Sequence, residues 1–456
     1  MLDYTTDMRI YFAGIGGVGL GPLAEIAADA GYEVSGSDPT SSLMTSQLQK
    51  RGVVVEPSQD GAFLAQTHAL TPIQWFVYSA SLPSDHPELQ MARKLGLRMT
   101  KRDEFLAYII KEKNLKLIAI AGTHGKTTTT GMMVWVLKQL GIPVSYAVGT
   151  TLSFGPGGKY DKDSQYFVYE CDEFDRNMLA FHPDLSLITS LGYDHSDTYP
   201  FEQDYQAAFA QFIEQSGHTI GWFHDLSKLP FISAEKAWQL HDEEVLDFSL
   251  TGIHNRQNAT LVAKACEYLS SQGNLFPEAS AAQASADAGS TEAWREAAEE
   301  NNVAEVSMRV INTFPGTNRR FEKLADNLYS DYGHHPEEIA ATLQMARELS
   351  DHVVLVYQPH QNVRQHEVVD QYTDCFSEAE KVYWLPTYLS REDPSLTVLT
   401  PKELSANVTN REVVEIADLN DALWQAIQAA RDAGKLVLCM GAGSIDEWLR
   451  HQLAIH

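Results

Sequence analysis

The stretch that decides the fold is LIAIAGTHGKTT, residues 117–128. Leu117 to Ala121 is a short apolar run, which is typical of a buried strand, and the residues after Lys126 follow a helical pattern to about Leu140. Between them lies a glycine-rich turn whose backbone N–H groups can surround phosphate oxygens. We therefore predict a phosphate-binding loop between a parallel strand and a helix.

The side chains of this loop have distinct predicted roles. Lys126 reaches the β and γ phosphates of a nucleotide in such a loop, and Thr127 meets Mg²⁺. The loop has the tight form G-x-x-G-K-T, because Ile120 occupies the place of the first glycine of the longer pattern. The predicted nucleotide contacts are Gly122, Thr123, Gly125, Lys126, Thr127 and Thr128.

A second glycine-rich turn lies near the N-terminus. The predicted strand Arg9 to Ala13 leads into Gly14 to Gly19, and a helical pattern follows from Leu20 to Ala30. The spacing G-x-G-x-x-G, with Asp38 about 20 residues further on, is typical of a dinucleotide site. It also fits a turn that only packs strand against helix. An NAD-linked oxidoreductase is therefore one alternative, although it leaves the Lys126 loop unexplained.

Acidic residues follow another predicted strand, Tyr166 to Glu170. Glu170 to Asp175 reads ECDEFD, and the carboxyl ends of parallel strands form the ligand crevice of an open sheet. Mg²⁺ prefers hard oxygen ligands, so we expect one or two of these carboxylates to bind it beside the loop. A solvated acidic surface is the alternative. His195 follows the predicted strand Leu185 to Thr189, but an isolated histidine is more often structural than a ligand.

Length and composition indicate a globular chain of several domains. It has 456 residues, 44% hydrophobic and 21% charged, and strand and helix patterns alternate throughout. We predict an α/β protein with parallel sheets in three domains: 1–112, 113–312 and 313–456. Lys111 to Lys116 is the expected first linker, and the Ala- and Ser-rich region of about 274–302 is expected to be a mobile insertion.

Charge and targeting signals restrict the partners. The formal net charge of −27 opposes non-specific binding to nucleic acid or to anionic membranes. No apolar run approaches the roughly 20 residues that span a bilayer, and the N-terminus lacks the pattern of a signal peptide. We therefore expect a cytoplasmic protein without membrane insertion. Its four cysteines, which have no C-x-x-C spacing, are expected to be reduced and mostly packed.

An acidic protein that binds anionic substrates needs local cations. Arg319, Arg320 and Arg364 can supply them, because guanidinium groups bind phosphates and carboxylates in bidentate fashion. Surface ion pairing is the alternative role for each of them. A zinc site at His334 and His335 is conceivable, but no further ligands follow at recognisable spacing.

Seven motifs, taken together and in order, resemble those of the Mur ligases. They are GTHGKTTT (Gly122–Thr129), ECDE (Glu170–Glu173), DHSDTY (Asp194–Tyr199), HNRQNA (His254–Ala259), RRFE (Arg319–Glu322), DYGHHP (Asp331–Pro336) and GAG (Gly441–Gly443). The resemblance covers nearly the whole chain. Within the family it is greatest to the members that join L-alanine to UDP-N-acetylmuramate.

The resemblance implies a three-domain architecture and a set of site residues. A Rossmann-like N-terminal domain would hold UDP-N-acetylmuramate, a central P-loop domain would bind ATP, and a Rossmann-like C-terminal domain would close over the site. The implied UDP-sugar contacts are Gly14, Gly16, Gly17, Val18, Gly19, Ser37 and Asp38. The implied nucleotide contacts outside the phosphate loop are Asn255 and Asn258, which would lie at the adenine, and Arg320 and Asp331.

The implied metal and acceptor sites complete this set. Thr127 and Glu170 would bind one Mg²⁺, and Glu170 with His195 a second. The amino acid would meet Tyr332, His334 and Arg364. The residues expected to act in catalysis are Lys126, Glu170, His195, Arg320, Asp331 and His334.

The implied reaction is ATP-dependent ligation through an acyl-phosphate. A carboxylate is a poor electrophile, so ATP must activate it before an amine attacks; Mg²⁺ and Lys126 offset the repulsion between the two anionic substrates. The expected partners are UDP-N-acetylmuramate and an amino acid, with the chain a monomer or weak homodimer. A murein-recycling ligase that adds L-Ala-γ-D-Glu-meso-diaminopimelate and a catalytically silent nucleotide-binding module remain alternatives.

Two features bear on the acceptor. The alanine-adding members usually show Q-P-H-R where this chain has Gln358-Pro359-His360-Gln361, so one expected arginine is absent. Relatives that add glutamate or a diamino acid carry a carbamylated lysine on the helix after the metal-binding histidine, whereas Glu202 to Glu214 contains no lysine. A small amino acid, L-alanine first, is the predicted acceptor.

Overall fold

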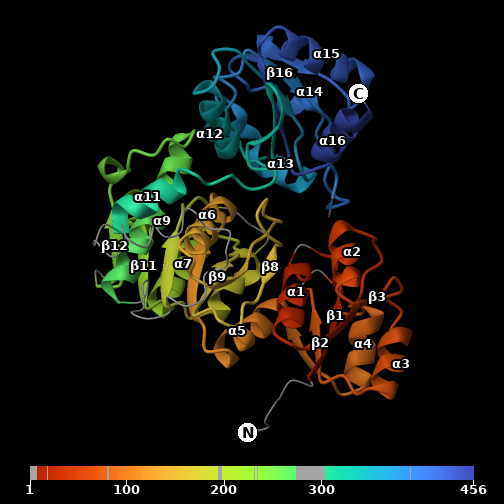
Figure 1. Ribbon diagram of the computed structural model, residues 1–456. Helices are drawn as coiled ribbons and strands as arrows, with labels where there is room; N and C mark the ends of the chain where they lie inside the picture. Colours follow the sequence, from red (N-terminus) through yellow and green to blue (C-terminus); the bar gives the residue numbers. More distant parts are fainter. Residues whose placement is uncertain are drawn as a thin grey trace. The chain divides into compact units, whose positions relative to one another are not determined.

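The computed structural model describes residues 8–17, 19–79, 82–193, 198–230, 232–233, 235–273, 303–390 and 392–455. The chain forms two compact units, Met1–Leu246 with Asn258–Pro315, and Asp247–Gln257 with Gly316–His456. Two sheets belong to the first unit and one to the second (Figure 1). In all three, helices alternate with strands that are mostly parallel, which confirms the predicted α/β class.

The first sheet has the strand order β3-β2-β1-β4-β5, and all its pairs are parallel. Its elements are β1 (Arg9–Ala13), α1 (Gly21–Asp29), β2 (Glu33–Ser37), α2 (Leu43–Lys50), β3 (Val54–Glu56), α3 (Ala62–Leu70), β4 (Trp75–Tyr78), α4 (Pro87–Lys94), β5 (Arg98–Lys101) and α5 (Arg102–Glu112). Strand order reverses at β1, which lies between β2 and β4. The turn after β1 therefore lies at the point where open α/β sheets bind ligands.

The second sheet has the order β12-β11-β10-β6-β9-β7-β8 and is parallel except for the short pair β7–β8. Its strands are β6 (Lys116–Ala121), β7 (Val144–Ala147), β8 (Gly158–Lys159), β9 (Tyr166–Glu170), β10 (Leu185–Ile188), β11 (His218–Trp222) and β12 (Ala237–Leu240). The helices are α6 (Lys126–Gln139), α7 (Glu202–Gln215), α8 (Phe223–Leu226), α9 (Ile253–Ser271) and α11 (Val303–Ile311), with 3₁₀ turns η1 (Phe174–Ala180) and η2 (Asp242–Glu244). Because β6 lies between β9 and β10, the loop after it adjoins the ends of both neighbours.

The third sheet has the order β13-β14-β18-β15-β16-β17, and only β13–β14 is antiparallel. Its strands are β13 (Glu322–Ala325), β14 (Leu328–Asp331), β15 (Val353–Tyr357), β16 (Lys381–Trp384), β17 (Val414–Ile416) and β18 (Leu436–Met440). The helices are α12 (Pro336–Arg347), α13 (Asn362–Val368), α14 (Pro401–Leu404), α15 (Asp421–Asp432) and α16 (Ile445–Ile455), with 3₁₀ turns η3 (Val369–Tyr372) and η4 (Arg411–Val413).

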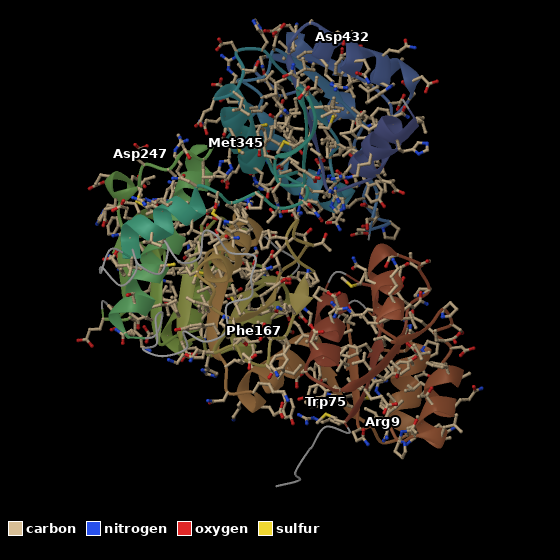
Figure 2. The ribbon with its side chains drawn as sticks, viewed as in Figure 1. Arg9, Trp75, Phe167, Asp247, Met345 and Asp432 are labelled. Atoms are coloured by element: carbon tan, nitrogen blue, oxygen red, sulfur yellow. The ribbon has the colours of Figure 1, made fainter. Side chains whose placement is uncertain are left out.

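One hydrophobic cluster is continuous through both sheets of the first unit. It contains Trp75 of β4 and Phe167 of β9, both almost fully buried and marked in Figure 2. In the second unit, separate clusters around Leu355 and around Val437 cover the two faces of the third sheet. All four cysteines are free and buried, as expected.

The predicted elements agree closely with the structure, and the connection between α5 and β6, residues 113–115, lies inside the predicted linker Lys111 to Lys116, which is longer. Its first residues belong to α5, which continues to Glu112 because Ile109 and Ile110 pack into the core, and β6 already begins at Lys116. The predicted insertion at about 274–302 lies outside the described residues. The boundaries at 112 and 312 stay predictions. None of the helices in the described part of the chain is both long and apolar enough to cross a membrane.

Candidate functional site

The predicted phosphate loop follows β6. Gly122 and Gly125 have φ angles of +138° and +84°, which L side chains rarely adopt, so glycine is needed at both positions. The N–H of Thr123 donates to the carbonyl of Ser190 at 3.0 Å, and the N–H of His124 donates to the Ser190 hydroxyl at 2.9 Å. Helix α6 then begins without a side-chain cap. A glycine turn that leads into such a helix N-terminus agrees with the predicted phosphate loop, whose role stays a prediction.

The ammonium of Lys126 is held inside this loop. It donates to the carbonyls of Gly122 and Thr123 at 2.5 and 3.1 Å, and to both carboxylate oxygens of Glu173 at 3.0 and 2.8 Å. The side chain of Glu173 is 1% exposed. Burial by itself lowers the pKa of Lys126, but Glu173 and Asp172 outweigh it and the pKa is raised. The lysine therefore stays charged.

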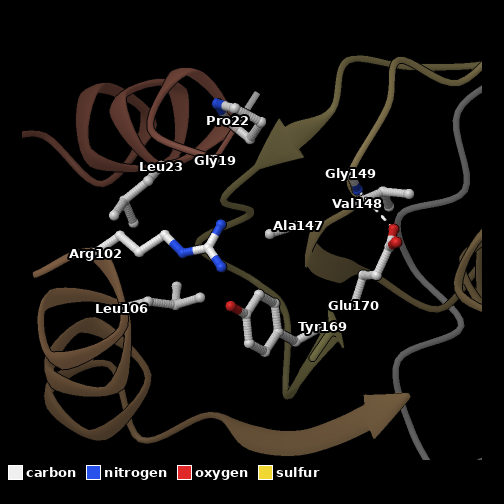
Figure 3. Close-up of a pocket in the computed structure, with 10 residues that line it drawn as sticks. All are labelled: Gly19, Pro22, Leu23, Arg102, Leu106, Ala147, Val148, Gly149, Tyr169 and Glu170. Carbon is white, nitrogen blue, oxygen red and sulfur yellow. Dashed lines mark hydrogen bonds between the residues drawn. The ribbon is translucent and has the colours of Figure 1, made fainter. Parts of the chain in front are cut away.

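Thr127 and Glu170 lie together, as the metal prediction requires. The Thr127 hydroxyl donates to Glu170 Oε1 at 2.7 Å, and the N–H of Gly149 donates to Glu170 Oε2 at 2.7 Å (Figure 3). A hydroxyl and a carboxylate are the hard oxygen donors that suit Mg²⁺. The predicted partner at the second metal, His195, lies outside the described residues. The metal roles stay predictions.

The two asparagines predicted at the adenine have different surroundings. Asn258 is buried, and a Cβ on Gly125 would lie 2.8 Å from its Oδ1, so it adjoins the phosphate loop. Asn255, in the first turn of α9, donates to the carbonyl of Thr251 at 2.9 Å. Thr128 is half-buried in the first turn of α6.

The turn after β1 is held by Ser37, the last residue of β2, and by Asp38, which follows it. The N–H groups of Gly14 and Ile15 donate to the carbonyl of Ser37 at 2.8 and 3.0 Å, and the N–H of Gly16 donates to the Asp38 carboxylate at 2.8 Å. The fully buried Ser37 hydroxyl donates to Glu88 at 2.7 Å. Ser37 and Asp38 thus fix the backbone of the turn by accepting hydrogen bonds from its N–H groups.

The other predicted UDP-sugar residues of this turn are glycines and Val18. The N–H of Gly17 donates to the carbonyl of Gly14 at 3.1 Å, and Gly19 lies against the Arg102 side chain. Val18 lies outside the described residues.

In the second unit, Asp331 ends β14. Its carboxylate accepts from the N–H groups of Phe321 and Gly333, both at 2.7 Å, and burial raises its pKa to about 6. The guanidinium groups of Arg319 and Arg320 lie 4.7 and 5.2 Å from the centre of the Tyr332 ring. Arg320, Asp331 and Tyr332 are therefore neighbours, as one site requires.

The predicted acceptor residues also come together. His334 Nε2 contacts Nη1 of Arg364, which belongs to α13, and its ring packs edge-on against Tyr332 at 5.9 Å. Burial lowers the pKa of His334 to about 4, and the charges of Arg364 and His360 act in the same direction. His334 is therefore neutral at neutral pH and accepts the hydrogen bond from arginine. The structure gives His335 a different place, as the cap of α12.

Gln361, the residue that departs from the alanine-adding pattern, precedes α13. It has φ of +61°, and its N–H donates to the carbonyl of Tyr388 at 2.9 Å. The adjacent His360 ring stacks on Tyr388 and packs edge-on against His334. The change from arginine therefore lies beside the acceptor cluster.

Sequence reasoning missed some partners within these sites. Glu173 was recognised only as one of several carboxylates, and its pairing with Lys126 was not predicted. Arg102 and its bond to Asp172, at 2.8 Å, were not foreseen at all. The ECDE run could have pointed to both, since one carboxylate at the metal leaves two that need cations.

Comparison with known proteins gives a consistent result. Three family models match in order: "Mur ligase family, catalytic domain" at residues 9–114, "Mur ligase middle domain" at 120–225 and "Mur ligase, glutamate ligase domain" at 319–443. The crystal structure of UDP-N-acetylmuramate-alanine ligase from Thermotoga maritima superposes with a TM-score of 0.72, covering 98% of this chain and 99% of that one at 22% identity. That likeness confirms the expected fold.

Two curated relatives are named UDP-N-acetylmuramate–L-alanine ligase. The protein of Synechococcus sp. (strain RCC307) is 30% identical, covering 99% of this chain and 97% of its own. That of Pediococcus pentosaceus is 32% identical, covering 97% of each. Because such similarity extends over almost the whole length and the family models match in order, the chain belongs to the Mur ligase family.

Proposed function

We propose that this protein joins L-alanine to the lactyl carboxylate of UDP-N-acetylmuramate and hydrolyses ATP to ADP and phosphate in doing so. One observation carries the proposal: relatives with that name align over nearly the full length of the chain. The pairs Lys126–Glu173 and Thr127–Glu170, at the carboxyl ends of β6 and β9, support it. We assign the reaction to the cytoplasm and to a monomer or weak homodimer.

The chemistry has two steps. A lactyl carboxylate oxygen attacks the γ-phosphorus of ATP, and the bond to ADP breaks, which leaves an acyl-phosphate. The amine of alanine then attacks the carbonyl carbon, loses a proton, and expels phosphate as the amide forms. Both steps bring anions together, so fixed positive charge at the γ-phosphate lowers the barrier.

Residues of the phosphate loop supply that charge. The ammonium of Lys126 is charged and preoriented by two carbonyls, so little reorganisation is needed when the phosphates arrive. Thr127 and Glu170 would hold Mg²⁺, which would polarise the phosphoryl oxygens. The loop glycines and the start of α6 would take the remaining phosphate oxygens.

The acceptor is proposed to bind at the cluster of Tyr332, His334 and Arg364. Arg364 offers a guanidinium for the carboxylate of the amino acid, and it is oriented by the neutral ring of His334. Arg320 and Asp331, beside this cluster, would contact the nucleotide.

A phosphate-release assay tests the proposal. The purified protein is mixed with ATP, Mg²⁺ and UDP-N-acetylmuramate, and L-alanine, glycine, L-serine or L-Ala-γ-D-Glu-meso-diaminopimelate is added separately. We expect the highest rate with L-alanine, slower rates with glycine and L-serine, and a product whose mass equals both substrates less water. A higher rate with the tripeptide would replace this function with the recycling one.

The metal requirement is tested in the same assay. EDTA should abolish phosphate release and excess Mg²⁺ should restore it, because Thr127 and Glu170 offer only oxygen atoms. Activity that survives EDTA would contradict the proposed role of these residues.

A further inference from the structure

A pocket in the first unit contains polar groups that the proposed function has not used. It encloses about 420 Å³ of space, part of which is open to solvent, and it lies between the start of α1, the start of α5 and the ends of β7 and β9 (Figure 3). Gly19 and Leu23 form one side, Arg102 and Tyr169 project into it, and Glu170 lies at the far side. The pocket therefore extends from the glycine turn of the first sheet to the predicted metal ligand of the second.

Arg102 is anchored at two of its three nitrogens. Nε donates to Asp103 at 3.1 Å and Nη2 donates to Asp172 at 2.8 Å. Among the described residues, Nη1 has no hydrogen-bond acceptor, and it lies where a Cβ on Gly19 would be. Glycine at position 19 thus leaves room for the Arg102 guanidinium. Two of its nitrogens are held by carboxylates, and Nη1 can still donate to a ligand.

Tyr169 offers a second donor in the same place. The residue is 7% exposed, and its hydroxyl has no hydrogen-bond partner among the described residues. Figure 3 shows the hydroxyl pointing toward Arg102. A phenolic hydroxyl carries its proton at neutral pH and can therefore donate to an anion. Two donors, one of them charged, therefore converge between apolar walls that include Leu23 and Leu106.

We propose that Nη1 of Arg102 and the hydroxyl of Tyr169 form an anion subsite that binds the diphosphate of the nucleotide sugar. The identity of the ligand as a nucleotide sugar rests on the proposed function. The binding of a diphosphate rests on the pocket itself. A charge-assisted hydrogen bond from a preordered guanidinium is the kind of contact that diphosphates select.

The position of the subsite favours the diphosphate over the lactyl carboxylate. Arg102 lies against Gly19, the last glycine of the turn, whereas Glu170 lies across the pocket at the metal end. The turn itself has lost a donor, because Asp38 occupies the N–H of Gly16 and brings a negative charge. A protein of net charge −27 therefore needs a separate cation at this turn, and Arg102 supplies it.

Isothermal titration with UDP tests the subsite. Arg102→Met should weaken UDP binding about 10- to 100-fold, which is the usual effect of losing a hydrogen bond to a charged group, and Tyr169→Phe about 3- to 10-fold. The affinity for ATP should stay within about twofold. Tyr146→Phe is the matched control, since its buried hydroxyl also lacks a partner but does not line the pocket. Normal UDP binding by Arg102→Met, or no UDP binding by the wild type, would overturn the subsite.

Asp172→Asn separates binding from a purely structural role of Arg102. If Arg102 only held Asp172, this variant would lose UDP affinity as Arg102→Met does, and the proposal would fail. If Arg102 binds the diphosphate, Asp172→Asn keeps or strengthens UDP binding, because it frees the guanidinium from a competing anion. Wild-type protein that binds UDP in an Arg102-dependent way but releases no phosphate with any acceptor would refute the proposed function and leave the subsite standing.

Discussion

At the scale of single residues, the buried pair of Lys126 and Glu173 shows how the loop keeps its charge before a nucleotide arrives. The carboxylate of Glu173 is 1% exposed and accepts twice from the ammonium. Taking either charge out of water is costly unless the other is present. The lysine is thus held charged by Glu173 at the place where the proposed reaction would develop phosphate charge.

Lys126→Met should therefore have two effects that a second substitution separates. Phosphate release should fall at least about 100-fold, because the charge opposite the γ-phosphate is lost. Stability should fall by about 3–5 kcal/mol, because Glu173 is left buried without a partner. The double variant Lys126→Met/Glu173→Gln should recover most of the stability and none of the activity, as measured by urea unfolding and phosphate release. Recovery of activity in the double variant would contradict the role of Lys126.

Burial shifts the pKa values of two groups of the second unit in opposite directions. Asp331 has its folded pKa raised from 3.8 to about 6 by burial, so its contribution to stability is complete below pH 3.8 and is lost as the pH rises through about 6. His334 has its folded pKa lowered from 6.5 to about 4 by burial, so its contribution is complete above pH 6.5 and is lost as the pH falls through about 4. Each shift corresponds to about 3 kcal/mol. As the pH falls from about 6 to about 4, Asp331 therefore raises the stability of the folded protein while His334 lowers it.

Single substitutions should reveal this compensation. Relative to the wild type, His334→Gln should gain stability as the pH falls from 6.5 toward 4, because it lacks the histidine that must stay neutral. Asp331→Asn should lose stability relative to the wild type over the same range, because it lacks the carboxyl that gains a proton. Urea unfolding of the three proteins at several pH values between 4.5 and 7 measures both differences. Parallel profiles of stability against pH for all three proteins would refute the opposite pKa shifts of Asp331 and His334.

At the scale of elements, the first turn of α9 is tied to α12 by an ion pair. Both guanidinium Nη atoms of Arg256 donate to Glu348, at 3.0 and 2.9 Å, and the N–H of Gly252 also donates to it. These hydrogen bonds, that of Arg256 first, lower the pKa of Glu348 to about 2 although burial opposes the shift. The pair fixes the turn that carries Asn255, which is predicted to lie at the adenine.

Glu348→Gln should consequently weaken ATP binding about 3- to 10-fold and lower stability by about 1 kcal/mol, since a bidentate pair is worth more than a single exposed contact. The matched control is Glu267→Gln, which removes an exposed ion pair to Lys264 further along the same helix. Titration with ATP and thermal unfolding give both numbers. Equal effects of the two substitutions would show that the anchored first turn has no special part in ATP binding.

At the scale of the whole molecule, the distribution of the core predicts how the chain unfolds. The first and second sheets share one continuous hydrophobic cluster, whereas the clusters around Leu355 and Val437 belong to the third sheet. Sheets that share a core unfold together, because neither keeps its buried surface alone.

Calorimetry should accordingly resolve two transitions rather than three. Saturating UDP should raise only one of them, that of the first unit, by an amount that corresponds to about 2.7 kcal/mol at a ligand concentration 100 times the dissociation constant. A third separable transition, or a shift of both by UDP, would contradict the shared core of the first two sheets.

Local sequence determined much of the secondary structure of this protein and the conformation of its phosphate loop. The strands Arg9–Ala13 and Tyr166–Glu170 were predicted with the bounds that the structure has, because each is a short, mostly apolar run next to turn residues. The phosphate loop was predictable for the same reason, since Gly122, Gly125 and Lys126 act through backbone geometry that a few adjacent residues fix. Lys111 and Glu112 were assigned to the linker because they are charged, whereas in the structure they form the end of α5.

Only the tertiary structure decided which charges meet. Lys126 and Glu173 are 47 positions apart, Arg102 and Asp172 are 70 apart, and Arg364 and His334 are 30 apart. A side chain's charge can be read from the sequence, but its partner depends on which strand ends the sheet order brings to one edge. Burial then sets how strongly the two interact, because the energy of a charge depends on the water that the whole fold excludes.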